Sequence, residues 1–189
     1  MALGHGGDVL YTAGGDGVVR AWDCARDMRS SVQSYTAVEV LRGPLFAVSA
    51  LLSQSRPRPR LLSAGMDNVM YEWDLSQHTA FTPQGRVRVA TRVFKGHEGV
   101  VNAMATWGTR TLLTGGGDGT LRVWDMDAVH DEDTLRRTFH MSDKASVAVR
   151  SLLVMDDSRV ITGTADGLMR MWLKVDEQHL GGATASGAA

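Results

Sequence analysis

Three observations predict an all-β fold of the β-propeller class: a segment that recurs four times, a hairpin signal inside each copy, and the absence of helical periodicity. The copies read VLYTAGGDGVVRAWD, RLLSAGMDNVMYEWD, TLLTGGGDGTLRVWD and RVITGTADGLMRMWL. Their tryptophans are Trp22, Trp73, Trp124 and Trp172, which gives steps of 51, 51 and 48 residues. A repeat of this kind is typical of short strands arranged blade beside blade.

The four copies agree at fixed distances before each tryptophan. A hydroxyl residue lies ten positions before, an aspartate six before, and a residue that tolerates positive φ five before. These are Thr12, Ser63, Thr114 and Thr162; Asp16, Asp67, Asp118 and Asp166; and Gly17, Asn68, Gly119 and Gly167. Asp-Gly or Asp-Asn between two apolar runs indicates a tight hairpin. Each copy is therefore predicted to form two antiparallel strands.

Apolar runs between the copies supply the remaining strands. They cover residues 45–52, 87–94, 100–105, 135–139 and 147–154. The first copy lacks an inner strand, since only eight residues precede Val9, and the last lacks an outer strand beyond Leu173. We therefore expect about four blades of a partial, unclosed propeller.

Composition is that of a globular chain of one domain. The 189 residues are 43% hydrophobic and 22% charged, and the net charge of -1 gives no electrostatic reason to expect nucleic acid. Residues 1–176 are assigned to the propeller segment and the featureless residues 177–189 to a flexible tail. Cys24 is the only cysteine, and no signal peptide or membrane-spanning run is visible. An intracellular, cytoplasmic location follows, with the nucleus as an open alternative.

Residues 96–125, GHEGVVNAMATWGTRTLLTGGGDGTLRVWD, resemble a complete repeat of the WD-repeat family. The resemblance extends over about residues 8–174. It implies a buried network in which an indole, a hydroxyl, an imidazole and a carboxylate are linked in order: Trp124, Thr114, His97 and Asp118. Such a network rigidifies a blade when every member is paired.

The other three copies depart from this pattern because they lack the histidine. Their residues with an expected structural role are Thr12, Asp16 and Trp22; Ser63, Asp67 and Trp73; and Thr162, Asp166 and Trp172. His140 is the only candidate for the fourth copy, but it lies 22 residues before the hydroxyl instead of 17. His5 lies too near Thr12 to take the role.

No catalytic residue, cofactor site or metal site is predicted. The glycine-rich turns join two strands and do not open a helix that could hold a phosphate. The acidic loop from Asp125 lacks the glycine and glutamate of a calcium loop, since His130 and Arg136 occupy those positions. A structural role for His97 is favoured over a role as catalytic base.

Three further features have an ordinary structural interpretation. Arginines two positions before the tryptophan are expected to lay their stems on the strands and keep their heads in water. They are Arg20, Arg122 and Arg170. Trp107 is expected in the core, with a binding contact at the rim as the alternative.

Function is expected to reside in loops held by the blades. The resemblance implies a non-enzymatic scaffold or adaptor that binds peptides or protein segments, through loops containing Arg42, Gly43, Pro44, His97, Glu98, Asp143 and Lys144, with Asp16 and Asn68 nearby. The opposite face carries the loop with Arg56, Arg58 and Arg60, expected to be solvated, and the acidic residues Asp131, Glu132 and Asp133.

The expected partners are other proteins, without nucleic acid or membrane insertion, and open blade faces predict self-association. Two alternatives stay open. One is a non-closing fragment of a larger WD-repeat protein, such as a ubiquitin-ligase substrate adaptor or a motor-associated propeller. The other, less favoured, is a propeller that binds a small ligand.

Overall fold

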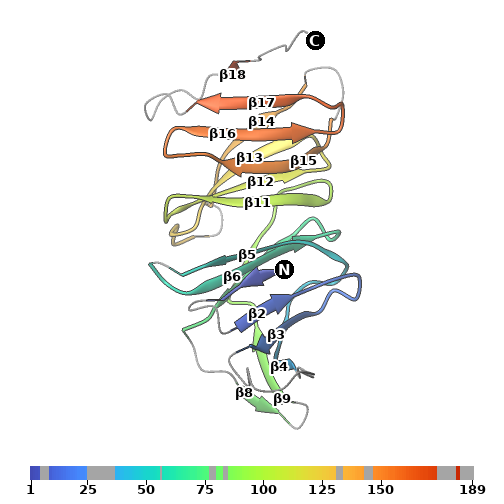
Figure 1. Ribbon diagram of the computed structural model, residues 1–189, viewed down its shortest axis with the longest axis vertical. Coiled ribbons are helices and arrows are strands. Elements are labelled where there is room, and N and C mark those ends of the chain that lie inside the picture. The colour runs from blue at the N-terminus through green and yellow to red at the C-terminus, as the bar shows by residue number, and fades with distance from the viewer. Residues whose placement is uncertain are drawn as a thin grey trace. The chain divides into compact units, whose positions relative to one another are not determined.

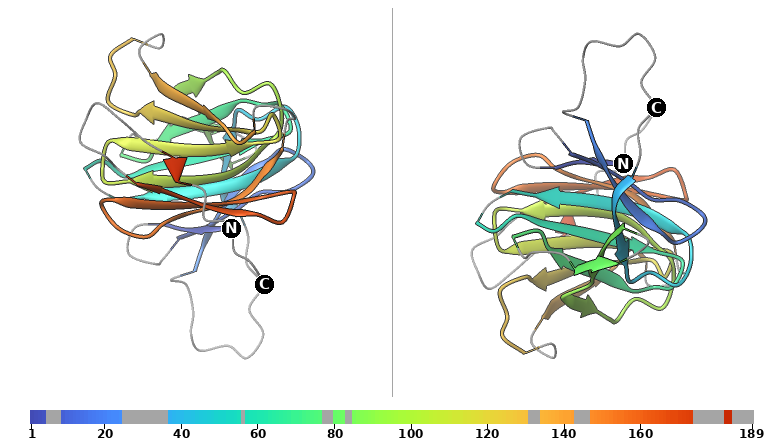
Figure 2. Two further views of the ribbon diagram at one scale, coloured as in Figure 1. Left: turned by 90° about the horizontal axis from the view of Figure 1, so that it is seen from above. Right: turned by 90° about the horizontal axis from the view of Figure 1, so that it is seen from below.

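The computed structural model describes residues 1–4, 9–24, 37–55, 57–76, 80–82, 85–130, 134–142, 147–173 and 182–183. Within these ranges the chain forms strands and connecting loops and no helix (Figures 1 and 2). The strands make four sheets. The all-β fold is thus confirmed. The chain divides into two compact units, Met1–Lys95 and Gly96–Ala189, each of which is described by itself.

Sheet A of the first unit has the strand order β1-β2-β3-β4-β9-β8. Its strands are β1 (Ala2–Leu3), β2 (Val9–Thr12), β3 (Val19–Asp23), β4 (Ala37–Arg42), β8 (Ala80–Thr82) and β9 (Gly85–Val89). The predicted hairpin is β2–β3. The expectation that the first copy lacks an inner strand is wrong, because β1 pairs antiparallel with β2 through Ala2 and Leu3.

Sheet B of the first unit has the order β10-β7-β6-β5. Its strands are β5 (Val48–Gln54), β6 (Arg60–Gly65), β7 (Met70–Asp74) and β10 (Arg92–Phe94). One core joins the two sheets. Val19, Ala21 and Leu41 of sheet A pack with Leu61 and Trp73 of sheet B, all of them at most 1% exposed.

The single strand predicted for residues 87–94 is wrong, because the run divides between the two sheets. β9 pairs in parallel with β4, whereas β10 pairs antiparallel with β7. The break lies between two neighbouring residues. The N–H of Ala90 donates to the carbonyl of Arg42 in β4 (3.2 Å), and that of Thr91 donates to the carbonyl of Glu72 in β7 (2.7 Å).

The second unit contains two four-stranded sheets. Sheet C has the order β11-β12-β13-β14: β11 (Val101–Trp107), β12 (Thr111–Gly116), β13 (Thr120–Asp125) and β14 (Leu135–His140). Sheet D has the order β15-β16-β17-β18: β15 (Val149–Val154), β16 (Arg159–Thr164), β17 (Met169–Leu173) and β18 (Gly182–Ala183).

β18 corrects the expectation that no outer strand follows Leu173. It pairs antiparallel with β17, with Gly182 opposite Trp172 and Ala183 opposite Met171. These two residues belong to the segment 177–189 that is expected to be a flexible tail. The remainder of that segment lies outside the described residues.

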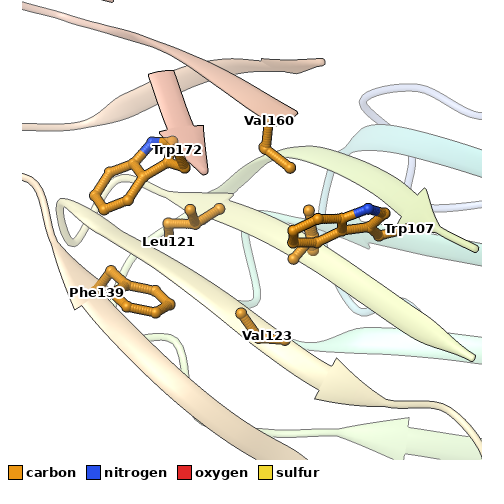
Figure 3. Close-up of a pocket in the computed structure, with 7 residues that line it drawn as sticks. Trp107, Leu121, Val123, Phe139, Val160 and Trp172 are labelled. Carbon is orange, nitrogen blue, oxygen red and sulfur yellow. The ribbon is translucent and has the colours of Figure 1, made fainter. Parts of the chain in front are cut away.

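The core of the second unit lies between sheets C and D. Leu113 and Leu121 of sheet C pack with Val160 and Trp172 of sheet D. Trp107 ends β11 and packs, partly buried, against this cluster. A cavity of about 10 Å³ remains among these side chains, and Figure 3 shows the aromatic and aliphatic groups that point into it. The lining is apolar, so the cavity offers a water no hydrogen-bond partner.

The tight turns occur where the sequence predicts them. The residue five positions before each tryptophan has positive φ: 70° at Gly17, 63° at Asn68, 74° at Gly119 and 81° at Gly167. Asn68 is the one described residue other than glycine with positive φ. The recurrent Asp-Gly or Asp-Asn pair is therefore a requirement of the turn.

Candidate functional site

Four polar side chains form a continuous hydrogen-bonded chain in sheet C. The indole N–H of Trp124 donates to Thr114 Oγ1 (2.8 Å), and Thr114 Oγ1 lies 2.7 Å from His97 Nε2. On the other side of the ring, His97 Nδ1 lies 2.8 Å from Asp118 Oδ2. The order is indole, hydroxyl, imidazole and carboxylate.

One protonation pattern gives every polar hydrogen of this hydrogen-bonded network an acceptor. The hydroxyl of Thr114 accepts from the indole of Trp124 and has one hydrogen, which it donates to an unprotonated His97 Nε2. The imidazole then carries its hydrogen on Nδ1 and donates it to Asp118. We assign this neutral tautomer from the hydrogen-bond geometry. The side chain of His97 is fully buried, so an unpaired group here would be costly.

Asp118 is the acceptor on which the turn depends. Burial acts to raise its pKa, but hydrogen bonds from His97, the N–H of Glu98 and Thr120 hold the pKa well below its usual range. Both carboxylate oxygens are occupied, since Oδ1 accepts from Thr120 and Oδ2 from His97 and Glu98. The carboxylate thereby ties the loop before the inner strand to the β12–β13 turn.

A second recurrent contact joins this aspartate to the residue four positions later. Arg20 pairs with Asp16 at 2.7 Å, Arg122 with Asp118 at 3.7 Å, and Arg170 with Asp166 at 3.4 Å. In the second copy the hydroxyl of Tyr71 donates to Asp67 (3.0 Å), and burial, followed by this aspartate, raises the pKa of Tyr71 to about 12.

The expectation that the three arginines keep their heads in water is therefore wrong for two of them. The side chains of Arg122 and Arg170 are only 11% and 13% exposed, whereas that of Arg20 is 37% exposed. A signal for this contact exists in the sequence. Every copy places a hydrogen-bond donor two positions before the tryptophan, on the same side of the hairpin as the aspartate.

The first and fourth copies keep the indole–hydroxyl bond without a histidine. Trp22 donates to Thr12 Oγ1 at 2.7 Å and Trp172 donates to Thr162 Oγ1 at 3.0 Å. In the fourth copy the hydroxyl of Thr162 faces Met141 Sδ at 3.9 Å. A buried thioether thus occupies the place of the imidazole.

His140 does not reach that place. It lies in β14, opposite Thr120 of β13, and it is exposed. The side chains of a strand alternate between its two faces, so the neighbouring Met141 turns inward where His140 turns outward. Residues 143–146 of the following insertion lie outside the described residues.

The second copy has lost the shared hydroxyl contact as well. The indole of Trp73 donates to the carbonyl of Arg42 (3.3 Å) instead of to Ser63. Ser63 Oγ is buried and finds no hydrogen-bond partner among the described residues. Gly43 permits the shift, because a Cβ there would lie 2.8 Å from the ring of Tyr71 and 3.0 Å from that of Trp73.

Two neighbouring loops of the first unit, one after Gly43 and one after Gly65, carry large exposed apolar side chains. Leu45, Phe46 and Met66 are 77%, 61% and 59% exposed. We call these three residues the Leu45 surface.

Backbone bonds hold this surface in place. The N–H of Leu45 donates to Asp67 (3.1 Å), and the N–H of Met66 donates to the carbonyl of Ala47 (2.9 Å). The N–H of Val48 donates to the carbonyl of Gly14 (3.1 Å), next to the first turn. Three loops of the unit therefore meet here.

The expected partner-binding residues are in different environments. Arg42 and Glu98 are exposed, and Pro44 is half-buried. The backbone of Gly43 packs on the rings described above. His97 has to be removed from this set, because its ring is buried and both nitrogens are engaged within the blade. Asp143 and Lys144 lie outside the described residues.

The loop that contains Arg56, Arg58 and Arg60 was expected to be solvated, and this expectation is wrong for Arg60. Arg60 is 1% exposed, donates to Gln54 Oε1 (2.6 Å) and pairs with Glu72 (3.4 Å). Arg58 is exposed as expected, and Arg56 lies outside the described residues. In the acidic loop, Asp131, Glu132 and Asp133 likewise lie outside them.

Asp125, at the start of the acidic loop, is buried. It accepts a two-pronged contact from Arg110, with Nε 3.0 Å from Oδ1 and Nη2 3.0 Å from Oδ2, and a further bond from Arg136 (2.6 Å). These hydrogen bonds hold the pKa of Asp125 well below its usual range, and the bond from Arg110 contributes most. Its carboxylate closes the outer loop of the blade and is not free for calcium.

The described ranges contain no group of three or more histidine, cysteine, aspartate or glutamate side chains that could hold a metal ion. In the same ranges, no helix is long and apolar enough to cross a membrane.

Comparison with known proteins matches the repeat directly. Residues 88–125 match the family described as WD domain, G-beta repeat. Mitochondrial division protein 1 of Schizosaccharomyces pombe is 28% identical over 91% of this chain, and the chain covers 28% of that protein. The chain thus spans little more than a quarter of the length of this curated relative.

Two solved structures share the fold. A chain in the crystal structure of the mitotic checkpoint complex has a TM-score of 0.71 at 21% identity, covering 94% of this chain and 50% of that one. The C-terminal WD40 domain of Sif2 has a TM-score of 0.67 at 17% identity, covering 88% and 40%. This chain has four sheets and covers half or less of each of these two propeller chains, so the prediction of a partial propeller is confirmed. Residues 88–125 thus form a WD repeat, and the chain has the β-propeller fold of WD-repeat structures.

Proposed function

We propose that this chain is a non-catalytic scaffold that binds segments of other proteins through its turn-side loops. The observation that carries the proposal is the Leu45 surface. Large apolar side chains are exposed there on loops whose backbones are bonded to neighbouring turns. Loops held by a rigid scaffold are where binding residues are most often found.

Rigidity is what makes this surface suited to binding. A loop that is already ordered loses little conformational entropy when a partner docks. The backbone of Phe46 packs against that of Gly17, because a Cβ on Gly17 would lie only 2.8 Å from the carbonyl oxygen of Phe46. The side chain of Phe46 projects 61% exposed from this support.

The chemistry of the surface defines the segment it would accept. Leu45, Phe46 and Met66 offer an apolar contact, and a thioether adapts to differently shaped apolar groups. The exposed guanidinium of Arg42 lies three residues before Leu45 and offers a fork for a carboxylate. We therefore expect a peptide or protein loop with an apolar anchor and a nearby acidic group.

The proposed location is intracellular. Cys24, half-buried, is the only cysteine of the chain, so no disulfide can form within it. Chains without disulfides are common in reducing compartments.

Quantitative mass spectrometry of proteins that co-purify with the tagged chain tests the proposal. The test variant is Leu45→Asp with Phe46→Asp, and the control is Val129→Asp, which changes an 89% exposed side chain in the second unit. Stoichiometric partners are then purified and titrated against each chain. Loss of an aromatic anchor should weaken binding about tenfold or more, and the control should bind as wild type. Equal affinity of all three chains would exclude this surface as the binding site.

A further inference from the structure

The face of sheet D that points away from sheet C carries apolar side chains in the open. Leu153, Met169, Met171 and Leu173 are 58%, 64%, 37% and 41% exposed. Ile161 joins them, because it lies between Leu153 and Met171 in the strand register. Val160 and Trp172 alternate to the opposite face and belong to the core. We call these five exposed or half-buried residues the outer face of sheet D.

Equivalent positions in two other blades are covered. In sheet A the residues three and eleven positions before the tryptophan are Val19 and Tyr11, which are 0% and 6% exposed and pack with residues of sheet B. In sheet C they are Leu121 and Leu113, which are 3% and 1% exposed and pack with residues of sheet D. In sheet D the same positions hold Met169 and Ile161. The outer face of sheet D therefore has the composition and register of a surface that another blade covers.

The covering side also has a constant composition. Sheet B covers sheet A with Leu61 and Trp73, and sheet D covers sheet C with Val160 and Trp172. In both cases the residues are the tryptophan itself and the aliphatic residue twelve positions before it. These four side chains are at most 8% exposed.

Sheet A carries the same pair at Leu10 and Trp22, but there both side chains are only half-buried. Leu3 extends this row, because Leu3 pairs with Leu10 and Leu10 pairs with Trp22. Leu3 is 65% exposed. Among the described residues, sheet D thus has an exposed face of the kind that is covered elsewhere, and sheet A has an incompletely buried face of the kind that covers elsewhere.

We propose that two copies of this chain associate head to tail, with the outer face of sheet D in one copy packed on the Leu3, Leu10 and Trp22 face of the other. The contact repeats between copies the packing found twice within the chain. It is heterologous, since it joins two different patches. Clusters of exposed apolar side chains are otherwise a liability for a protein in water.

Sedimentation velocity of the purified chain over a concentration series tests the proposal. The wild-type chain should sediment as a species with at least twice the 20.4 kDa mass of one chain. Met169→Glu with Met171→Glu on sheet D, and separately Leu3→Glu on sheet A, should each sediment as a monomer. Val129→Glu, which changes a side chain that is 89% exposed and lies on neither face, should behave as wild type. Circular dichroism establishes that each variant keeps its β-structure.

Mixing the two monomeric variants separates this pairing from every other. The sheet D variant keeps an intact sheet A face, and the sheet A variant keeps an intact sheet D face, so an equimolar mixture should form a dimer through one contact. A wild-type monomer at all concentrations, or variants that stay associated, would overturn the proposal. A mixture that contains only monomers would overturn it as well.

Discussion

Two equivalent hydroxyls, Thr114 and Ser63, are predicted to affect stability with opposite sign. Both side chains are fully buried ten positions before a tryptophan. Thr114 accepts from the indole of Trp124 and lies within hydrogen-bond distance of His97, whereas Ser63 has no partner among the described residues. Shape-conserving removal of each hydroxyl measures what the network contributes.

Thr114→Val leaves two buried groups without a partner, the indole N–H of Trp124 and His97 Nε2. Each unsatisfied buried group costs about 1–3 kcal/mol, so the free energy of unfolding should fall by about 2–6 kcal/mol. Ser63→Ala removes a buried hydroxyl that is already unpaired. The free energy of unfolding should then rise by about 1 kcal/mol, because the cost of burying that group is relieved.

Urea denaturation followed by tryptophan fluorescence measures both changes. Each variant is compared with wild type at equal protein concentration, and the slope of the free energy against urea shows whether the denatured state has changed. If Ser63→Ala destabilises the chain as much as Thr114→Val, the hydroxyl of Ser63 is bonded and the comparison of the two copies is refuted.

Three further predictions concern pH and packing. The pKa of Asp118 is lower in the folded than in the unfolded chain, so ionised Asp118 stabilises the fold fully above about pH 4 and progressively less as the pH falls further. Asp118→Asn should therefore make the stability depend less on pH in acid unfolding monitored by circular dichroism. An acid-unfolding profile identical to that of wild type would contradict this role of Asp118. A Cβ on Gly65 would collide with the carbonyl of Ala47, so Gly65→Ala should lower the melting temperature, whereas Gly14→Ala, with open space around it, should not. Leu113→Ala should cost about 2–5 kcal/mol in urea denaturation and Leu113→Met less than about 1.5; equal costs would show that packing between sheets C and D does not depend on volume.

The sequence predicts the local part of this structure well. The hairpin turns follow from Asp-Gly and Asp-Asn pairs, and all four residues expected at positive φ have it. The order of contacts in sheet C was predicted from the resemblance of one segment, and the hydrogen bonds of Trp124, Thr114, His97 and Asp118 follow that order. Each of these features depends on residues close together in sequence or on one repeated pattern.

The pairing of strands was harder to predict because hydropathy does not encode the partner. Residues 87–94 alternate as one strand would, yet the chain changes sheets between Ala90 and Thr91. β1 and β18 are two residues each, too short for any periodicity. Short edge strands of this kind are defined by the neighbour to which they bond, not by their own composition.

The electrostatic contacts show the same limit. Arg60 follows an Arg-Pro run that suggests solvation, but it is buried between Gln54 and Glu72. Met141, and not the candidate His140, faces Thr162, because the alternation of side chains decides which of two neighbours turns inward. The exposed Leu45 surface carries no motif, and only burial in the folded unit distinguishes it from core residues.

Hydrogen exchange on the complex with a co-purifying protein tests the central claim most directly. If the turn-side loops bind protein segments, amides of residues 42–48 and 65–68 should exchange more slowly in the complex than in the free chain. Slower exchange confined to other parts of the chain, with these loops unchanged, would contradict the account.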